Sequence, residues 1–451
     1  MDSPRGDEAT VDPAETTFAT RGRTVGDVSV PAALSALPRP LVAWTGDDER
    51  VAGGGSAATI TASGPARFER IQSAGESLFA GRTVDRELPR VARPRLFGGF
   101  AFHAEEKENG QSRWRGFPDA QFVLPAVQVV TGGPEESTWL VANATGANAA
   151  ARATERLDRW TDRVRDLRDV DPATTPKPGI AKRTYAPDEA GWRRQVEAGV
   201  ARIADGALQK VVLAQALTVD LEREFSVSAA YARLAETYPE CFKFVVAPED
   251  GGQFFGATPE RLVTRDGRTV RTEALAGSTG RGDTPAEDEW LARELQGSEK
   301  DRHEHDLVVE AIKDQLAPFA TAVSTGDRTV KKLATVQHLQ TPVTADLAED
   351  DHVLSLVRAL HPTPAVGGLP PDEALKTIIE TEAFERGWYA SPVGWFDAAG
   401  NGTFAVAIRS AVASERRATL FAGNGIVADS DPDREWDEVQ LKYPPVLDVL
   451  E

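Results

Sequence analysis

A chain of 451 residues with 41% hydrophobic and 27% charged residues has the composition of a globular protein. Its formal net charge of −19 argues against a nucleic-acid-binding protein and against docking on an anionic membrane, because both need a basic surface. Cys241 is the single cysteine, which excludes an intrachain disulfide and a cysteine-rich zinc site. The sequence shows neither an apolar leader nor a long apolar run, which predicts a cytoplasmic protein.

The charged residues are rich in Asp, Glu and Arg and poor in Lys. Only 11 of the 51 basic residues are lysine, while Asp and Glu together number 70. This bias predicts a halophilic protein that stays soluble in a salt-rich cytoplasm, where ions screen the repulsion between like charges. The alternative is an ordinary acidic enzyme.

The first part of the chain divides into predicted segments. Residues 1–23 are polar and are predicted to be mobile. Residues 24–180 contain short apolar runs separated by glycines, which predict antiparallel strands, and an Ala- and Arg-rich helix at 147–167. The proline-rich segment 171–179 predicts a connector, so that residues 181–451 form a second region.

In the second region strands come in runs and helices in groups, which predicts an α+β fold rather than alternating βα units. Helices are expected at 186–205, at 226–238 and on both sides of Gly297 and Ser298, and strands at 209–221, 242–246, 253–256, 262–264, 394–396, 403–413 and 420–427. The glycines within 422–426 predict a turn with free N–H groups at the end of the last strand.

A first group of acidic residues lies in the helix that Ser298 can cap. Glu304 falls on the apolar stripe of this helix, three residues before Leu307. A buried carboxylate needs a partner, and carboxylate oxygens suit Mg²⁺. His303 and His305 raise the alternative of zinc, but histidines two residues apart lie on different faces of a helix.

The last predicted helix, which begins at Pro432, carries a second acidic group. Glu435, Glu438 and Lys442 fall on one face of it. Two like charges one turn apart repel each other, and a bound cation would reverse that effect. The alternative is a solvated charged face near the end of the chain.

Lys210 and Glu260 stand beside apolar strands. Lys210 opens the strand 209–221, and Glu260 follows Pro259 directly after another strand. A lysine held in a pocket can act as a base, and a buried carboxyl can act as an acid. The alternatives are a lysine whose amine reaches the solvent and a turn residue paired with Arg261.

Nine segments of the second region form an ordered set of motifs. They are KVVLAQ (210–215), GATPERLV (256–263), TEALAGSTGRG (272–282), SEKDRHEHDLVVEAI (298–312), VQHLQTPV (336–343), HPTPAVGGLP (361–370), ERGWYASPVGWFD (385–397), FAVAIRSA (404–411) and AGNGIVADSDPDREWDEVQLK (422–442). In this order they resemble the chorismate-utilising enzymes, and most closely the isochorismate synthases among them. The resemblance is dense over residues 208–443 and weak before the connector.

The resemblance implies two large antiparallel sheets that face each other, with helices outside and with strands contributed by residues 24–180. It implies conversion of chorismate to isochorismate, in which water attacks C2 of the ring and the C4 hydroxyl leaves. Lys210 matches the general base that takes a proton from water, and Glu260 matches the general acid that protonates the leaving hydroxyl. This chemistry needs an uncharged amine and a protonated carboxyl.

The resemblance also implies a Mg²⁺ cofactor that holds the ring carboxylate of the substrate. Its ligands match Glu304, Glu435 and Glu438, with Asp301 as an outer partner. The substrate contacts match Ser278, His338, Ala365, Tyr389, Arg409, Gly423, Gly425 and Lys442. A planar guanidinium suits a carboxylate because it can bind both oxygens.

Leu275 and Ala276 match the positions that separate activities within the family. Ala276 stands where aminodeoxychorismate synthase carries a lysine that attacks the ring, so that water is implied as the nucleophile. Anthranilate synthase component I uses ammonia from a glutaminase partner, and here a monomer without that partner is expected. Salicylate synthase, which also eliminates pyruvate, and anthranilate synthase component I remain the alternative functions.

Three residues depart from the related motifs. Gln215 stands where an arginine is common, Ser278 where a threonine is frequent, and Asn424 where a small residue is usual. None of these changes removes a predicted catalytic group. Asn424 is the one that can alter the carboxylate pocket.

Overall fold

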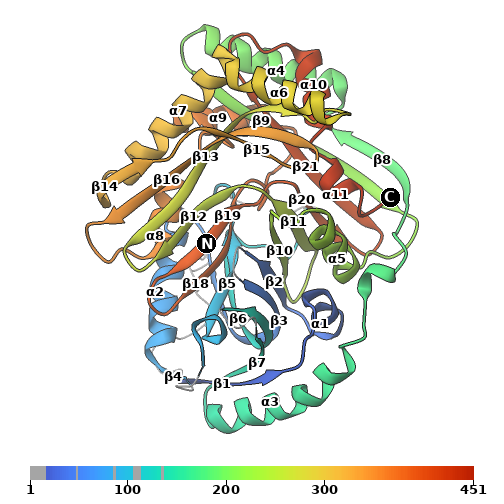
Figure 1. Cartoon of the computed structure of the whole chain (residues 1–451), viewed down its shortest axis with the longest axis vertical. Coiled ribbons are helices and arrows are strands. Elements are labelled where there is room, and N and C mark those ends of the chain that lie inside the picture. The colour runs from blue at the N-terminus through green and yellow to red at the C-terminus, as the bar shows by residue number, and fades with distance from the viewer. Residues whose placement is uncertain (1–16, 47–48, 85–87, 105–112, 134–136) are drawn as a thin grey trace, which may run out of the picture.

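The computed structural model describes residues 17–46, 49–84, 88–104, 113–133 and 137–451 (Figure 1). Most of the predicted mobile segment 1–23 lies outside these residues. For residues 18–23 the prediction is wrong, because they belong to strand β1 (Phe18–Val25), whose first residues are buried and which pairs along its whole length with a neighbouring strand.

The strands form two long arms. The first arm runs from β3 (Glu49–Ala62) through β2 (Leu41–Thr45), β10 (Phe242–Ala247), β11 (Gln253–Thr258), β20 (Ser410–Ser414) and β21 (Arg417–Ile426) to β9 (Lys210–Leu221). Strands β8 (Ile180–Ala186) and β17 (Gly368–Leu369) pair with different parts of β9. Every pairing in this arm is antiparallel.

The second arm is also antiparallel. It runs from β6 (Ala120–Gly132) through β5 (Arg95–Phe100), β18 (Pro392–Asp397), β19 (Gly402–Val406), β12 (Arg261–Asp266) and β13 (Thr269–Gly280) to β16 (Val336–Leu347). Strands β14 (Ala320–Thr325) and β15 (Thr329–Lys332) pair with β16. Beside β6 also lie β7 (Thr138–Thr145), then β1, and then the short parallel partner β4 (Arg82–Val84).

Strand β6 joins the two arms. It pairs with β3 along one edge, and with β5 and β7 at different positions along the other. The two facing sheets are therefore parts of one hydrogen-bonded system. In Figure 1 the far ends of the arms come together again in the upper part of the molecule, where β9 and β21 lie near β13.

Helices cover the outside of this system, so the α+β prediction is confirmed (Figure 1). They are α1 (Val30–Ala36), α2 (Arg67–Ala80), α3 (Ala149–Asp166), α4 (Glu189–Ala204), α5 (Val227–Thr237), α6 (Pro285–Gly297), α7 (Glu299–Leu316), α8 (Val353–Leu360), α9 (Pro371–Thr381), α10 (Pro432–Gln440) and α11 (Pro444–Leu447). Helix α3 shows why the sequence forms them: Ala153, Leu157, Trp160 and Val164 recur at helical spacing and are buried.

Two local predictions need correction. The expected strand 403–413 is divided into β19 and β20, because the backbone of Arg409 between them turns into the left-handed region with a φ of 50°. The expected turn at 422–426 is instead the end of β21, where these residues pair with β9. Both differences bring residues of the second region to the wall of one pocket.

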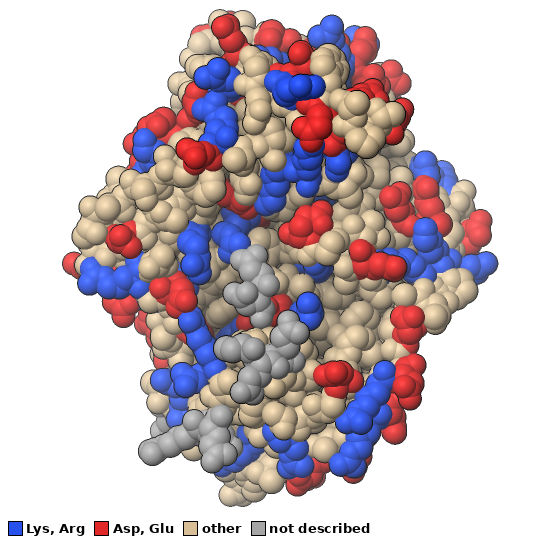
Figure 2. Space-filling view, in the orientation of Figure 1, with Lys and Arg blue, Asp and Glu red and all other residues tan. Residues whose placement is uncertain are grey.

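The surface charges and the helices of the described residues agree with what the composition predicts, namely neither a broad basic surface nor a membrane-spanning helix. On the face shown in Figure 2, acidic and basic side chains are interspersed among the described residues rather than gathered in one broad basic patch. None of the helices in the described part of the chain is both long enough and apolar enough to cross a membrane.

Candidate active site

One pocket, with a volume of about 970 Å³ that includes its open mouth, brings all the predicted site residues together. Its lining includes Lys210, Glu260, Leu275, Ala276, Ser278, Asp301, Glu304, His338, Ala365, Tyr389, Arg409, Gly423, Gly425, Glu435, Glu438 and Lys442. These residues come from β9, β13, β16, β21, α7 and α10 and from segments that connect other strands and helices. The ends of both arms therefore build the pocket, although the residues are far apart in the sequence.

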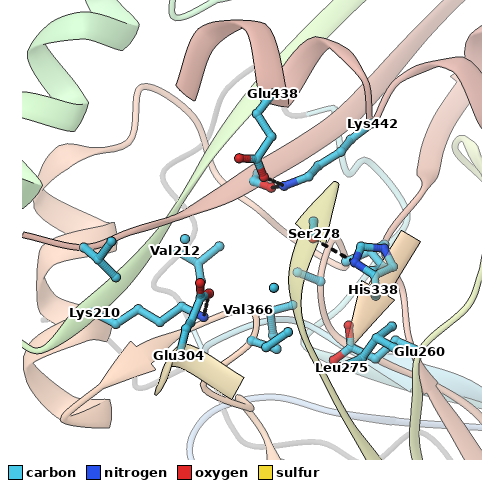
Figure 3. A pocket seen from close by; sticks show the side chains of 18 of the residues that line it. Lys210, Val212, Glu260, Leu275, Ser278, Glu304, His338, Val366, Glu438 and Lys442 are labelled. Atoms are coloured by element: carbon cyan, nitrogen blue, oxygen red, sulfur yellow. Dashed lines mark hydrogen bonds and ion pairs between the residues drawn. The ribbon is translucent and has the colours of Figure 1, made fainter. Parts of the chain in front are cut away.

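Lys210 is the first residue of β9, and its side chain is nearly inaccessible to solvent, with 2% of its surface exposed. Its Nζ donates a hydrogen bond to Oε1 of Glu304 over 2.7 Å (Figure 3). Gly425 on the neighbouring strand leaves room for this pair, because a Cβ there would lie 2.7 Å from Cε of Lys210 and 3.2 Å from Oε1 of Glu304.

Glu260 lies between β11 and β12, and a hydrogen bond from the backbone N–H of Val406 to its carbonyl oxygen holds its backbone. Its side chain is buried, and the hydroxyl of Thr363 donates to Oε1 over 3.5 Å. Burial, with a smaller contribution from Glu273, raises the pKa of Glu260 to about 7. A large share of this carboxyl is therefore protonated near neutral pH. Figure 3 shows Lys210 and Glu260 on opposite sides of the pocket.

Four carboxylates line the pocket from two helices, with Asp301 and Glu304 on α7 and Glu435 and Glu438 on α10. Burial raises the pKa of Asp301, and Glu304 and Glu438 add to this effect. Burial also raises the pKa of Glu435, with a contribution from Glu438. Neighbouring carboxylates therefore oppose the ionisation of Asp301 and Glu435, which is an effect that a bound cation would relieve.

The structure neutralises part of this negative charge with lysines. Burial opposes ionisation of Glu304, but Lys210 outweighs it, so the pKa of Glu304 is lowered. Lys442 donates to Oε1 of Glu438 over 2.9 Å. Among the described residues, no three His, Cys, Asp or Glu side chains are gathered so that they could hold a metal ion. The oxygen donors fit Mg²⁺ in their chemistry, and the predicted metal site stays a prediction.

The opposite side of the pocket is suited to an anion. Arg409 is buried, and within the described part of the chain its guanidinium has neither an ion pair nor a side-chain hydrogen bond. Burial lowers the pKa of Arg409 and raises that of Tyr389 to about 12, so that Tyr389 keeps its phenolic proton. A buried, unpaired guanidinium beside a phenol is an arrangement that binds a carboxylate.

His338 on β16 hydrogen-bonds through Nδ1 to the hydroxyl of Ser278 on β13, over 2.7 Å (Figure 3). Burial lowers the pKa of His338 to about 3, with contributions from the positive charges of Arg409 and Lys442. The imidazole is therefore neutral near pH 7, and it presents a polar group without adding charge to the pocket.

The specificity position lies beside an irregular step in β13. Pairing of β13 with β16 shifts register between Ala276 and Ser278, where Gly277 has a φ of 75°. His305, which is fully buried on α7, contacts the carbonyl oxygen of Ala276 through Nδ1 over 3.2 Å and the hydroxyl of Thr341 through Nε2 over 2.8 Å. This histidine thus ties α7 to the sheet.

Comparisons with known proteins show which family the chain belongs to. The model of the chorismate-binding enzyme family matches residues 33–451. The chain belongs to this family. The match also covers residues 33–180, where the sequence has none of the nine motifs.

Several family members are similar to this chain over most of its length. The salicylate biosynthesis isochorismate synthase of Pseudomonas aeruginosa is 36% identical over 91% of this chain and 85% of its own. The isochorismate synthase MenF of Bacillus subtilis is 36% identical over 79% of this chain and 74% of its own. The structure of MenF from Escherichia coli, the menaquinone-specific isochorismate synthase, matches with a TM-score of 0.79 and 26% identity over 99% of this chain and 97% of its own.

Sequence reasoning missed some residues of this pocket. Arg386 and Lys300 also line it. The fully buried Arg386 pairs with Glu382 and donates to the carbonyl oxygens of Val366 (2.8 Å) and Val212 (2.7 Å), so it fixes two walls of the pocket. Arg386 could have been predicted as a pocket residue, because it lies in the motif ERGWYASPVGWFD three residues before Tyr389.

Proposed function

We propose that this chain is an isochorismate synthase that converts chorismate to isochorismate. Water adds at C2 of the ring, the C4 hydroxyl leaves as water, and the double bonds rearrange, so that the two compounds are isomers. The observation that carries the proposal is the placement of Lys210 and Glu260 on opposite sides of one pocket, with the pKa of Glu260 raised to about 7 (Figure 3).

Glu260 and Lys210 have separate roles in the proposed reaction. Glu260, protonated in a large share of molecules near pH 7, donates its proton to the leaving hydroxyl. Lys210 takes a proton from the attacking water. Its amine lines the pocket and bonds to Glu304, so it must part from Glu304 and give up its extra proton before it can take one from water. Ala276 has no amine, so no lysine at this position of the pocket wall attacks the ring in place of water.

Two ends of the pocket hold the two carboxylates of chorismate. Arg409 and Tyr389 bind the enolpyruvyl carboxylate, because Arg409 is buried without a protein anion in the described residues and Tyr389 can donate its proton. Lys442, Ser278 and His338 contact the ring carboxylate. Glu304, Glu435 and Glu438, with Asp301 beside them, are the residues that would hold Mg²⁺. Bound there, Mg²⁺ supplies positive charge that orients the ring carboxylate and stabilises it.

The isochorismate formed serves the synthesis of menaquinone or a siderophore in this proposal, as the names of the similar enzymes suggest for those proteins. The enzyme works in the cytoplasm as a monomer and without a glutaminase. Size-exclusion chromatography with light scattering measures the oligomeric state, and a mass near 97 kDa, twice the 48.5 kDa of one chain, would contradict the monomer.

A product assay tests the function. Purified protein is incubated with chorismate and Mg²⁺ alone, and the products are separated by liquid chromatography and identified by mass. The proposal expects a new product that separates from chorismate on the column and has the same mass. Accumulation of fluorescent salicylate would show that pyruvate is also eliminated, and anthranilate formed on addition of ammonium would show the third activity. Either result contradicts the proposal.

A further inference from the structure

Asn424 lies behind the wall of the pocket. It stands on β21 between Gly423 and Gly425, which both line the cavity. Side chains alternate along a strand, so the side chain of Asn424 points to the opposite face. That side chain is 1% exposed and bonds to residues in and just after α10.

Both ends of the Asn424 amide are used. Nδ2 donates to the carbonyl oxygen of Glu435 over 2.8 Å and to its Oε2 over 3.1 Å. Oδ1 accepts a hydrogen bond from Nζ of Lys442. One buried amide therefore connects an acidic residue and a basic residue of the pocket, and a side chain with only acceptors or only donors could not make both connections.

The other contacts of Glu435 and Lys442 complete this arrangement. The hydroxyl of Ser430 donates to Oε1 of Glu435 over 2.8 Å. Lys442 donates to the carbonyl oxygen of Gly423 and to Glu438, each over 2.9 Å. Each carboxylate oxygen of Glu435 thus accepts one neutral donor, and each keeps a lone pair for a further partner.

We propose that Asn424 is a positioning residue, which orients Glu435 toward a divalent cation and Lys442 toward the ring carboxylate of the substrate. The identity of these two ligands rests on the proposed function. Asn424 touches neither ligand, because its side chain lies on the far side of the strand. It acts through the two groups that it holds.

Physical arguments support this role. The neutral donors Asn424 and Ser430 fix the orientation of the Glu435 carboxylate without placing a positive charge against it. Asn424 also gives Lys442 an acceptor that is not the carboxylate of Glu435, so Glu435 stays available. Hydrogen-bond partners that orient metal ligands typically change metal affinity by about 10- to 100-fold when they are removed.

The test measures binding in the absence of turnover. In the Glu260→Gln protein, which lacks the proposed acid, the dissociation constant of chorismate is measured by calorimetry with and without Mg²⁺. The measurement is repeated after adding Asn424→Ala, and after adding Asn424→Asp, which keeps the shape and the acceptor for Lys442 but replaces the donor that faces Glu435. Asn401→Ala is the matched control, because Asn401 also donates to a carboxylate, that of Asp397, but does not line this pocket.

Asn424→Ala is expected to weaken chorismate binding without Mg²⁺ through Lys442, and to reduce the gain that Mg²⁺ gives by about 10- to 100-fold through Glu435. Asn424→Asp is expected to leave chorismate binding without Mg²⁺ unchanged and to reduce the gain in binding that Mg²⁺ gives. Dissociation constants equal to those of the Glu260→Gln parent in both variants would overturn the proposal. If Mg²⁺ does not tighten chorismate binding by the Glu260→Gln parent, the dissociation constants without Mg²⁺ alone test the proposal, and an unchanged value in Asn424→Ala overturns it.

This outcome is separable from the fate of the proposed function. The unsubstituted chain either forms isochorismate or does not, and that assay involves no change at Asn424. A protein that makes isochorismate but binds both ligands equally well with and without Asn424 disproves only the positioning role. The thermal unfolding of each variant shows whether a weakened protein is still folded.

Discussion

The two sides of the pocket hold their charges in different ways. Toward α7 and α10 charges occur as pairs, with Lys210 bonded to Glu304 and Lys442 bonded to Glu438. Toward β16 and the segment between β19 and β20, Glu260 and Arg409 are buried and make no ion pair within the described residues. On the paired side, the carboxylates can release their lysines to bind a cation, and the lysines can then bind a substrate carboxylate. On the unpaired side, the buried groups have no protein partner to release before the substrate binds.

The pKa shifts follow this difference. On the unpaired side burial dominates, and it moves the pKa of Glu260 to about 7, of His338 to about 3 and of Tyr389 to about 12. On the paired side a lysine lowers the pKa of Glu304 against the effect of burial. Desolvation thus prepares an acid and neutral donors where the reaction needs them, and the pairing with Lys210 favours the ionised form of Glu304.

The largest expected effect is on the unpaired side. Glu260→Gln removes the proton donor but keeps the shape, and we expect kcat to fall by about 10²- to 10⁴-fold. Steady-state production of isochorismate measures this loss. A kcat within threefold of the original value would contradict the role of Glu260, and Glu310→Gln, a change at an exposed carboxyl that does not line the pocket, is the control.

Lys210→Ala tests the paired side. It removes the proposed base and leaves Glu304 without its partner, and we expect a loss of kcat of about 10²- to 10⁴-fold in a protein that still folds. Lys313→Ala is the matched control, because this exposed lysine on α7 also bonds to a glutamate, Glu310, over 2.8 Å. An exposed pair of this kind contributes little, so the control should stay active. Normal turnover by Lys210→Ala would refute the assignment.

Arg409→Lys should act mainly on substrate binding. A lysine keeps the charge but loses the planar pair of donors, and loss of hydrogen bonds to a charged group corresponds to about a 10- to 100-fold weaker interaction. We expect this increase in KM for chorismate with a smaller change in kcat. Arg417→Lys, at an exposed pair on β21, should leave KM unchanged. A larger effect on kcat than on KM would place Arg409 in the chemical step instead.

Glu438→Gln should weaken the response to Mg²⁺. The amide keeps an oxygen but loses the charge, and we expect the half-saturating Mg²⁺ concentration to rise by at least about tenfold. Isochorismate production as a function of Mg²⁺ concentration measures it. An unchanged titration curve would remove Glu438 from the set of ligands.

The smallest expected effect concerns stability, and its sign is opposite to that on activity. Because the pKa of Glu260 is about 7 in the folded protein and 4.5 in the unfolded reference, the folded state binds the proton more tightly between these values. Stability therefore falls as the pH rises through this window. Glu260→Gln should have a Tm a few degrees above the original protein at pH 8, and the difference should disappear near pH 4. Equal Tm values at pH 8 would mean that the carboxyl is not desolvated.

The sequence predicted the fold class and the residues that line the pocket, but not how the strands are connected. Motifs hold residues such as Lys210, Glu260 and Glu438 in recognisable local patterns, and the structure brings all sixteen predicted residues to one pocket. The role of β6 as the strand shared by both arms was not predictable, because it depends on pairings between segments far apart in the chain. The break at Arg409 was missed because apolar runs lie on both sides of it, at 404–408 and 411–413, and the left-handed backbone that separates β19 from β20 is not visible in such a pattern.

Gly425 has a consequence for experiments that replace every residue in turn. It has no functional group, yet a methyl group there would lie within 3.2 Å of both members of the Lys210–Glu304 pair. A saturation mutagenesis screen for growth or activity would therefore report this position as intolerant, next to the acid and the base themselves. The cause would be steric, because the amine of Lys210 needs the space beside Gly425 in order to reach Glu304.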